Sequence, residues 1–317
     1  MLLLALAINV VLETAHVLVV DKPPGPVVHG EPGSVLDALR AERGGDFYPA
    51  HRLDAVTSGL LVFGKSKQAA RELGALWEAG GVAKGYVGLA AKPGRRKRGR
   101  VSGDMARAQR GKAFKLLRTR TNPAVTDFVS LGMGEAQGQG EVVAAAKRMF
   151  LCRPVTGQTH QIRVALKSNG AALLGDALYA GAASDRVYLH AAYLAMSAGI
   201  CGEAPIELVS RPSVGAEFAS ERFRNVWDAQ GVPGRLRAMV SGSGGGRVTA
   251  CASPLGGRQR PAVVLRSTSP GPSTPLVDDS LRPGTRHRAR AMTCRTCTPS
   301  ARACCASRTR RRNPWAG

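Results

Sequence analysis

Two short segments contain most of the side chains that could take part in catalysis. The first, His51–Gly59 (HRLDAVTSG), places the carboxylate of Asp54 two residues after Arg52. An acid in a basic neighbourhood is held ionised, and an ionised carboxylate in a cleft can act as a nucleophile or as a base. The same residues also fit an ordinary turn acid that is capped by Thr57 and Ser58. The segment taken alone leaves both interpretations open.

The second segment, Thr156–Val164 (TGQTHQIRV), combines a turn with several hydrogen-bond donors. Gly157 allows a tight turn, and Arg163 can pair bidentately with a carboxylate or a phosphate. A contact to phosphate at the protein surface explains the same residue types equally well. The other donors of the segment are Thr159, His160 and Gln161.

The composition indicates which classes of partner to consider. The chain has 317 residues, with 45 Lys and Arg against 22 Asp and Glu and a formal net charge of +23. Such an excess points to a polyanionic partner, either nucleic acid or an anionic membrane surface. No apolar run is long enough to span a membrane, and we expect no membrane association. A hydrophobic content of 44% argues against disorder throughout the chain.

The composition changes toward the C-terminus. Residues 238–317 contain 14 Arg and two Asp, with neither Lys nor Glu. We therefore predict one globular domain over residues 8–232 and a disordered, basic tail rich in Arg, Ser, Gly and Pro over residues 233–317. Five of the seven cysteines lie in this tail, so the body is no disulfide scaffold and an intracellular protein, cytoplasmic or organellar, is expected. Cys294 and Cys297 lack a second well-spaced pair, and we expect no metal.

The hydrophobic pattern predicts an α+β fold with a mixed sheet and large loops. We read the apolar N-terminus as strand material rather than a secretory signal, because no positive charge precedes it. Helices are expected over Ser34–Arg40 and Lys67–Glu78, capped by Ser34 and Ser66, and over His160–Lys167. Strands are expected over Val10–Val20, around Val62 and Phe63, and over Val82–Ala90, Val125–Leu131, Glu141–Cys152 and Tyr188–Met196, with a basic loop over 92–112.

At this point four segments together resemble a known family. HRLDAVTSG is similar to the signature of the RluA-type pseudouridine synthases. Three further stretches match that family in order and spacing: VVDKPPGPVVHG at 19–30, KGYVGLA at 84–90, and TGQTHQIRV followed by GAALLGDALY and VYLHA. The resemblance covers roughly residues 10–200. It implies the pseudouridine synthase catalytic fold, with a largely antiparallel sheet and a central RNA-binding cleft.

The resemblance also implies a role for single residues. Asp54 matches the catalytic aspartate, Tyr86 the tyrosine that stacks on the target base, and Arg163 the arginine that pairs with the catalytic carboxylate. Converting uridine to pseudouridine breaks the N-glycosidic bond and rejoins the base through carbon 5. This isomerisation needs neither a redox change nor an external reagent, so no cofactor is expected.

Other matches concern the surroundings of that site. Arg52 matches a position that helps to hold the RNA once the uridine has left the stack, and Leu189 a hydrophobic position near the base pocket. Lys22 and Pro23 match a motif that we interpret as structural. Two positions depart from the pattern: the family often has Arg where this chain has Gln158, and His where it has Ala165. These departures concern RNA affinity or packing rather than the chemistry.

The sequence therefore predicts an RNA pseudouridine synthase that acts as a monomer on ribosomal or transfer RNA. The first motif begins near residue 19, so we expect RNA selection to depend on the catalytic domain, its basic loop and the tail. His160 and His190 are expected to form structural hydrogen bonds. Two alternatives remain: a non-catalytic RNA-binding protein on the same fold, and a general basic protein that binds DNA and RNA alike. Phosphate contacts are expected from the basic loop, at Arg95, Arg96, Lys97, Arg98 and Arg100.

Overall fold

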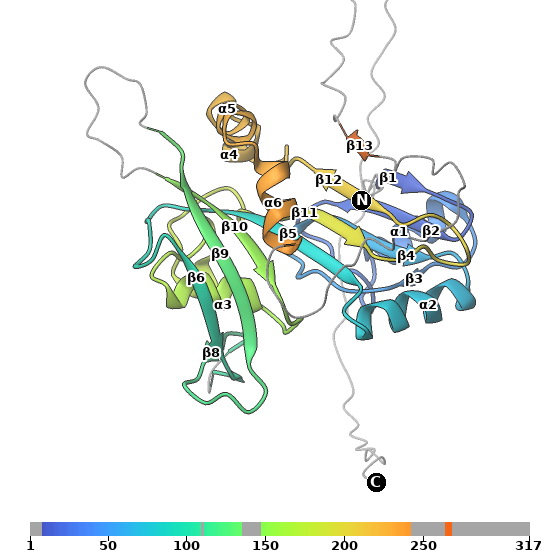
Figure 1. Ribbon diagram of the computed structural model, residues 1–317, viewed down its shortest axis with the longest axis horizontal. Helices are drawn as coiled ribbons and strands as arrows, with labels where there is room; N and C mark the ends of the chain where they lie inside the picture. Colours follow the sequence, from blue (N-terminus) through green and yellow to red (C-terminus); the bar gives the residue numbers. More distant parts are fainter. Residues whose placement is uncertain (1–7, 109–110, 135–146, 242–263, 268–317) are drawn as a thin grey trace, which may run out of the picture. The chain divides into compact units, whose positions relative to one another are not determined.

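The computed structural model describes residues 8–108, 111–134, 147–241 and 264–267 (Figure 1). These residues belong to one compact unit that extends to Pro270. Within them, no helix is long and apolar enough to cross a membrane. Most of the predicted tail, including Cys294 and Cys297, lies outside the described residues, as does the start of the strand predicted from Glu141.

A mixed sheet of eleven strands forms the centre of the fold. Its strands pair antiparallel except for β4 with β11 and β12 with β13. Along the main path they are β1 (Asn9–Glu13), β2 (Val17–Lys22), β4 (Ser58–Gly64), β11 (Leu189–Met196), β5 (Val82–Ala90), β10 (Arg148–Pro154), β9 (Ala124–Gly132) and β6 (Arg98–Gly103). Beside this path, β3 (Tyr48–Pro49) pairs with β4, and β12 (Glu207–Ser210) joins β11 to β13 (Val264–Ser267). A separate two-stranded sheet contains β7 (Met105–Arg107) and β8 (Phe114–Leu116).

Helices connect and cover these strands. Both predicted caps are confirmed: the Ser34 hydroxyl accepts a hydrogen bond from the backbone of Asp37, and the Ser66 hydroxyl accepts one from Ala69. Each cap satisfies a backbone donor that the first helical turn leaves unpaired. The helices are α1 (Val35–Arg43), α2 (Lys67–Glu78), α3 (Gln161–Ser168), the 3-10 turn η1 (Ala177–Tyr179), α4 (Ala216–Ala219), α5 (Glu221–Ala229) and α6 (Val232–Ser241).

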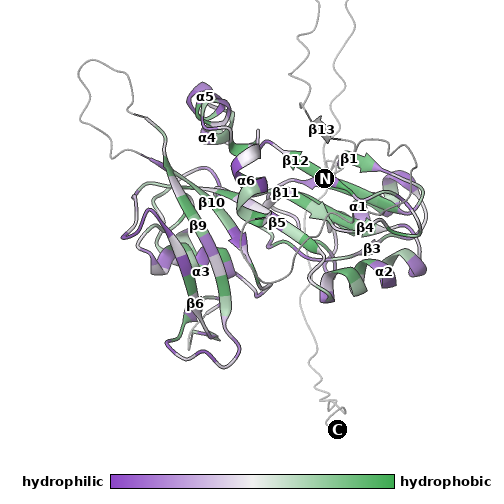
Figure 2. Ribbon diagram, viewed as in Figure 1, coloured by the Kyte–Doolittle hydropathy of each residue, from purple (hydrophilic) through white to green (hydrophobic). Residues whose placement is uncertain are grey.

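Strand β4 shows why the central strands read as continuous apolar runs. All seven of its residues are buried. Leu61 and Phe63 belong to one hydrophobic cluster, whereas Leu60 and Val62 belong to another. Because side chains alternate between the faces of a strand, β4 has a core on each side. In Figure 2 the central strands are mostly hydrophobic, while α2 has both hydrophobic and hydrophilic residues.

Two predicted elements differ from the structure. The strand material expected over Val10–Val20 is two antiparallel strands, β1 and β2, because the hydroxyl of Thr14 accepts a hydrogen bond from the backbone of Val17 and closes a turn. The basic loop expected over 92–112 contains strands β6 and β7. Strand β6 lies at the edge of the sheet beside β9. An edge strand tolerates charged side chains, and because of these charges the sequence was interpreted as a loop.

The ordered fold continues past the domain boundary predicted at residue 232. Helix α6 extends to Ser241 and buries Val232, Leu236 and Val240, which lie four residues apart on one helical face. Within the predicted tail, β13 also pairs with β12. The Gly- and Arg-rich surroundings of α6 concealed this short apolar stripe in the sequence.

Candidate active site

Asp54 lies in the loop between β3 and β4, and its side chain is 18% exposed. The backbone N–H of Thr57 donates to the carbonyl of Asp54 at 3.0 Å and closes a turn. The N–H of Gly25 donates to the carbonyl of Ala55 at 2.8 Å. The loop is therefore fixed through its backbone, which leaves the Asp54 carboxylate free to face the cavity.

Lys22 anchors the same loop from the end of β2. Its ammonium group is fully buried and donates to the carbonyls of Pro23, Ala55 and Thr57 at 2.9, 3.0 and 2.9 Å. Three acceptors satisfy all three of its donors. Burial lowers the pKa of Lys22 to about 8, helped by the charge of Arg186 and opposed by that of Asp54. These contacts agree with the structural interpretation of the Lys-Pro motif.

Gly59 lets the strand that follows Asp54 approach β11 closely. Its φ angle is +115°, and a Cβ atom there would lie 2.4 Å from the backbone oxygen of Ala191. Ser58 and Gly59 pair with His190 and Ala191 in the parallel β4–β11 ladder. Glycine at this position is therefore needed to bring the Asp54 loop beside the strand that begins at Leu189.

Arg163 is held chiefly by a partner that the sequence analysis did not single out. Its Nε and Nη2 donate to the two carboxylate oxygens of Asp176 at 2.7 and 2.8 Å. Its Nη1 faces Asp54 Oδ2 at 3.5 Å. Burial by itself would lower the pKa of Arg163, but Asp176, followed by Asp54, outweighs it and raises that pKa. Arg163 therefore stays charged beside Asp54.

One cavity of about 510 Å³ brings the sequence-predicted residues together. Asp54, Arg52, Tyr86, Arg163 and Leu189 all line it. Tyr86 is 9% exposed, and its pKa is raised by burial and then by the charge of Asp54. Its phenol is therefore protonated at neutral pH and presents both a ring face and an O–H group.

The two departures from the family pattern lie in different places. Gln158 lines the cavity, and its side chain donates to the carbonyl of Asn122 at 3.1 Å. Ala165 is buried in the hydrophobic core. The first position therefore bears on ligand contacts, and the second on packing.

Three further cavity residues were missed as site candidates. Lys84 lies over the ring of Trp77 at 5.9 Å, and His51 stacks on the same ring at 4.8 Å. Burial lowers the pKa of Lys84. The available signals were the Lys-x-Tyr motif for Lys84 and the signature segment for His51. Trp77 was interpreted only as a residue on the apolar face of a helix.

Apart from Arg52, the basic residues predicted to bind RNA do not line this cavity. Arg95, Arg96 and Arg100 line a second hollow, whereas Lys97 and Arg98 line neither. They lie on and before strand β6. The structure thus separates them from the Asp54 site and divides them into two groups.

The two histidines expected to be structural both form hydrogen bonds. His160 Nδ1 lies 2.9 Å from the hydroxyl of Tyr179, although His160 also lines the cavity. His190 is buried between Ser58, at 2.9 Å, and Ser210, at 3.3 Å. Within the described residues, no three His, Cys, Asp or Glu side chains gather into a group that could hold a metal ion.

The site can therefore hold a planar ring against Tyr86 and Leu189 while the Asp54 carboxylate reaches its edge. Arg163 forms an ion pair with that carboxylate. Such a cavity suits a reaction that needs a nucleophile or base and must retain a detached ring. An isomerisation at the junction of a sugar and a base has these requirements.

Comparisons with known proteins agree with this chemistry. Residues 16–168 match the family described as RNA pseudouridylate synthase. The chain is 35% identical over 192 residues to an uncharacterised RNA pseudouridine synthase of Haemophilus influenzae. The aligned region covers 59% of this chain and 81% of that protein. It is 31% identical over 208 residues to ribosomal large subunit pseudouridine synthase C of Escherichia coli, covering 60% of this chain and 62% of that one.

A solved structure is similar as well. Human RNA pseudouridylate synthase domain containing 1 aligns with a TM-score of 0.56 and 25% identity, over 67% of this chain and 86% of the human one. This likeness confirms the predicted α+β fold with its mixed, largely antiparallel sheet. Because the match to the Haemophilus protein runs along most of that protein's length, the chain belongs to the RluA-type RNA pseudouridine synthases, a family of isomerases.

Proposed function

We propose that this protein isomerises specific uridines of ribosomal RNA to pseudouridine, with Asp54 as its catalytic carboxylate. The observation that carries the proposal is the convergence of Asp54, Tyr86 and Arg163 on one cavity. A non-catalytic RNA-binding protein would not need a charged carboxylate paired with an arginine inside a cavity. The choice of ribosomal RNA follows the name of the Escherichia coli relative, a ribosomal large subunit synthase.

The reaction begins with a uridine leaving its stack, at a cost of a few kcal/mol. Its base enters the cavity between Tyr86 and Leu189, and Asp54 acts at the junction of sugar and base as nucleophile or base. The bond from N1 to C1′ breaks, and the bond from C5 to C1′ forms. C5 loses its proton and N1 gains one, so atoms and charge balance without any co-reactant.

Each neighbour of Asp54 has a distinct part in this proposal. Arg163 lies 3.5 Å from the Asp54 carboxylate and orients it. Tyr86 holds the detached uracil by stacking, because its ring lines the cavity and is mostly buried. Arg52, which also lines the cavity, contacts the RNA backbone once the uridine has been flipped out.

Contacts between the protein and RNA phosphates offset the cost of flipping. The basic residues on and before β6 are suited to this because all are exposed. They comprise Arg95, Arg96, Lys97, Arg98 and Arg100. Such contacts position the RNA without reading its sequence.

A pseudouridine map of total RNA tests the proposal directly. It compares cells with the intact gene, cells without it, and cells carrying only Asp54→Asn. We expect one or a few ribosomal uridines to lose the mark in both deficient strains, while the purified Asp54→Asn protein still binds RNA. If the mark were lost from transfer RNA instead, the proposed reaction would stand but its substrate would be transfer RNA. If every pseudouridine were still present in the Asp54→Asn strain, the catalytic role of Asp54 would be refuted.

A further inference from the structure

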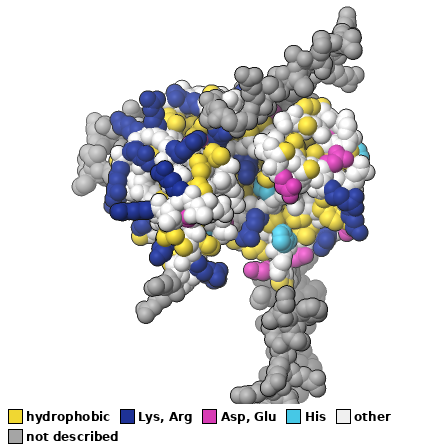
Figure 3. All heavy atoms as spheres, turned by 60° about the horizontal axis from the view of Figure 1, so that its bottom comes forward, with side chains coloured by type: hydrophobic (Ala, Val, Ile, Leu, Met, Phe, Trp, Pro, Cys, Tyr) yellow, Lys and Arg dark blue, Asp and Glu magenta, His cyan; other side chains and the backbone are white. Residues whose placement is uncertain are grey.

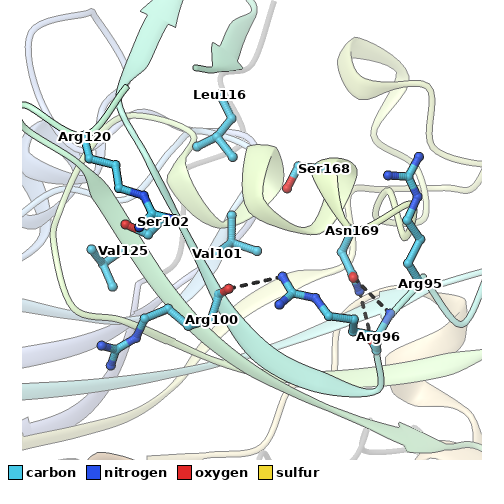
Figure 4. A pocket seen from close by; sticks show the side chains of 10 residues that line it. All are labelled: Arg95, Arg96, Arg100, Val101, Ser102, Leu116, Arg120, Val125, Ser168 and Asn169. Atoms are coloured by element: carbon cyan, nitrogen blue, oxygen red, sulfur yellow. Dashed lines mark hydrogen bonds between the residues drawn. The ribbon is translucent and has the colours of Figure 1, made fainter. Parts of the chain in front are cut away.

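A second hollow of about 930 Å³ lies beside strand β6 and shares no lining residue with the Asp54 cavity. We call it the arginine hollow. Its walls include Arg95, Arg96, Arg100, Arg120, Val101 and Asn169 (Figure 4). The four arginines come from the segment before β6, from β6 itself and from the connection between β8 and β9. Separate parts of the chain thus contribute positive charge to one concave surface.

Asn169, at the C-terminal end of α3, fixes part of the hollow. It is 3% exposed, and its backbone carbonyl accepts from the N–H of Arg95 at 2.7 Å. Its side chain accepts from the N–H of Arg96 and donates to the Arg96 carbonyl, each at 3.1 Å. Gly94 permits this approach, because a Cβ there would lie 2.5 Å from Asn169 Nδ2. The backbone beneath both arginines is therefore pre-organised.

The charges of the hollow are not equally available. Arg100 forms two hydrogen bonds with Asp127, at 2.7 and 3.0 Å, which neutralise it. Arg96 donates to the carbonyl of Arg100 at 3.2 Å and lies between Asn169 and Arg100 in Figure 4. Within the described part of the chain, no acidic group pairs with Arg95, Arg96 or Arg120. Arg95 and Arg120 are therefore available to an external anion, and Arg96 keeps further N–H donors besides the one bonded to Arg100.

Helix α3 connects the arginine hollow to the Asp54 cavity. Arg163, near its start, lines the cavity, and Ser168, at its end, lines the hollow. Five residues at about 1.5 Å each place these positions roughly 8 Å apart along the helix axis. A strand of a few nucleotides is long enough to reach from one position to the other. One strand can therefore occupy both sites.

The surrounding surface favours a polyanion over a single small anion. Figure 3 shows Lys and Arg side chains gathered on the left part of one face, where Figure 1 places β6, β9 and α3. The acidic side chains visible in that view lie mainly on the other part. A surface rich in Lys and Arg suits a nucleic acid backbone.

We propose that the arginine hollow binds backbone phosphates of the RNA strand whose uridine enters the Asp54 cavity. Arg95, Arg96 and Arg120 supply the contacts, since a guanidinium pairs bidentately with phosphate. The inference deepens the proposed function and depends on it for the identity of the strand. It assigns Arg120 to the RNA site. It also implies that Arg95 and Arg96 contribute more to RNA affinity than Lys97 and Arg98.

Two double variants of the full chain distinguish RNA binding by the arginine hollow from non-specific attraction by positive surface charge. Arg95→Gln with Arg120→Gln removes two charges from the hollow, and Lys67→Gln with Arg71→Gln removes two exposed charges on α2 that line neither the hollow nor the Asp54 cavity. All four side chains are exposed, so both proteins should keep the wild-type Tm. The binding of a labelled oligouridine RNA is measured against salt concentration, in an Asp54→Asn background that prevents turnover.

For the hollow pair we expect the Kd to rise about tenfold, and the slope of log K against log salt to fall by about 1.4, or roughly 0.7 for each lost phosphate contact. The control pair should change the Kd less than about threefold. Equal effects of the two pairs would overturn the inference, because they would show only diffuse charge.

Pseudouridine formation, assayed separately with Asp54 restored, distinguishes the two proposals. If the wild-type protein forms pseudouridine but the hollow pair binds RNA normally, the hollow is not the phosphate site and the proposed function stands. If no protein forms pseudouridine yet the hollow pair still weakens RNA binding, the hollow stands as a phosphate site and the proposed function fails. Support for both requires an increased KM with a nearly unchanged kcat in the hollow pair.

Discussion

The carboxylate of Asp176 accepts two hydrogen bonds from the guanidinium of Arg163, at 2.7 and 2.8 Å. The remaining nitrogen, Nη1, faces Asp54 at 3.5 Å. Both members of the pair are almost fully buried, with Arg163 5% and Asp176 1% exposed. A bidentate pair fixes the plane of the guanidinium as well as its position. Asp176 therefore acts as a positioning residue that aims Arg163 at the proposed catalytic carboxylate.

Asp176→Asn tests this positioning role. The amide keeps one acceptor oxygen but loses the second hydrogen bond and the charge, so Arg163 becomes less fixed. We expect kcat to fall by roughly 10–100-fold, or about 1.4–2.7 kcal/mol, with KM within about twofold because substrate contacts remain. Single-turnover kinetics on the mapped RNA would measure this split. An unchanged kcat in the folded variant would show that Asp54 does not depend on the aim of Arg163.

Gly59→Ala tests the close approach of β4 and β11. The added Cβ would lie 2.4 Å from the backbone oxygen of Ala191, at a φ of +115°. We expect a loss of about 3 kcal/mol or more in the free energy of unfolding, from steric overlap and backbone strain together. Gly30→Ala is the matched control, because it has a φ of +89° and nothing within 4 Å. Equal losses in denaturant melts would mean that backbone strain alone explains the effect.

His190 predicts a specific acid dependence of stability. Burial, the main cause, lowers its pKa in the folded protein below 6.5, although Asp21 opposes the shift. Below pH 6.5 the unfolded chain therefore binds a proton that the folded chain does not, so stability falls as the pH falls. This group contributes a slope of at most about 1.4 kcal/mol per pH unit. In His190→Asn the free energy of unfolding, measured between pH 6.5 and 5, should have a shallower slope, by no more than that amount, whatever its value at neutral pH. An identical slope would mean that His190 is already charged in the fold.

Two truncations test where the ordered fold ends. Ending the chain after Ser241 keeps α6, whereas ending it after Gly231 removes the helix and its buried Val232, Leu236 and Val240. We expect the shorter protein to be less stable than the longer one by about 3 kcal/mol or more, since each buried aliphatic side chain contributes about 1.5–3 kcal/mol. That loss corresponds to a Tm lower by roughly 5–10 °C. Equal Tm values would restore the boundary at residue 232.

Elements whose signals are local could be predicted from the amino-acid sequence. Ser66 and the apolar spacing after it predicted the helix at Lys67–Glu78, and the run at Val82–Ala90 predicted a strand with the observed bounds. The four ordered motifs were enough to indicate the family. These features can be predicted from the sequence because caps, turns and short apolar runs depend on residues that are neighbours in the chain.

Contacts between residues far apart in the chain could not be predicted in this way. Asp176 pairs with Arg163 from 13 residues away, and Lys22 reaches Thr57 across 35 residues. The tertiary structure also showed that Arg120 joins Arg95 and Arg96 in one hollow. Such contacts depend on how the sheet brings distant segments together, and burial then determines which charges are paired and which remain free. Residue types along the chain do not contain that geometry, which arises only when the strands pair and their core excludes water.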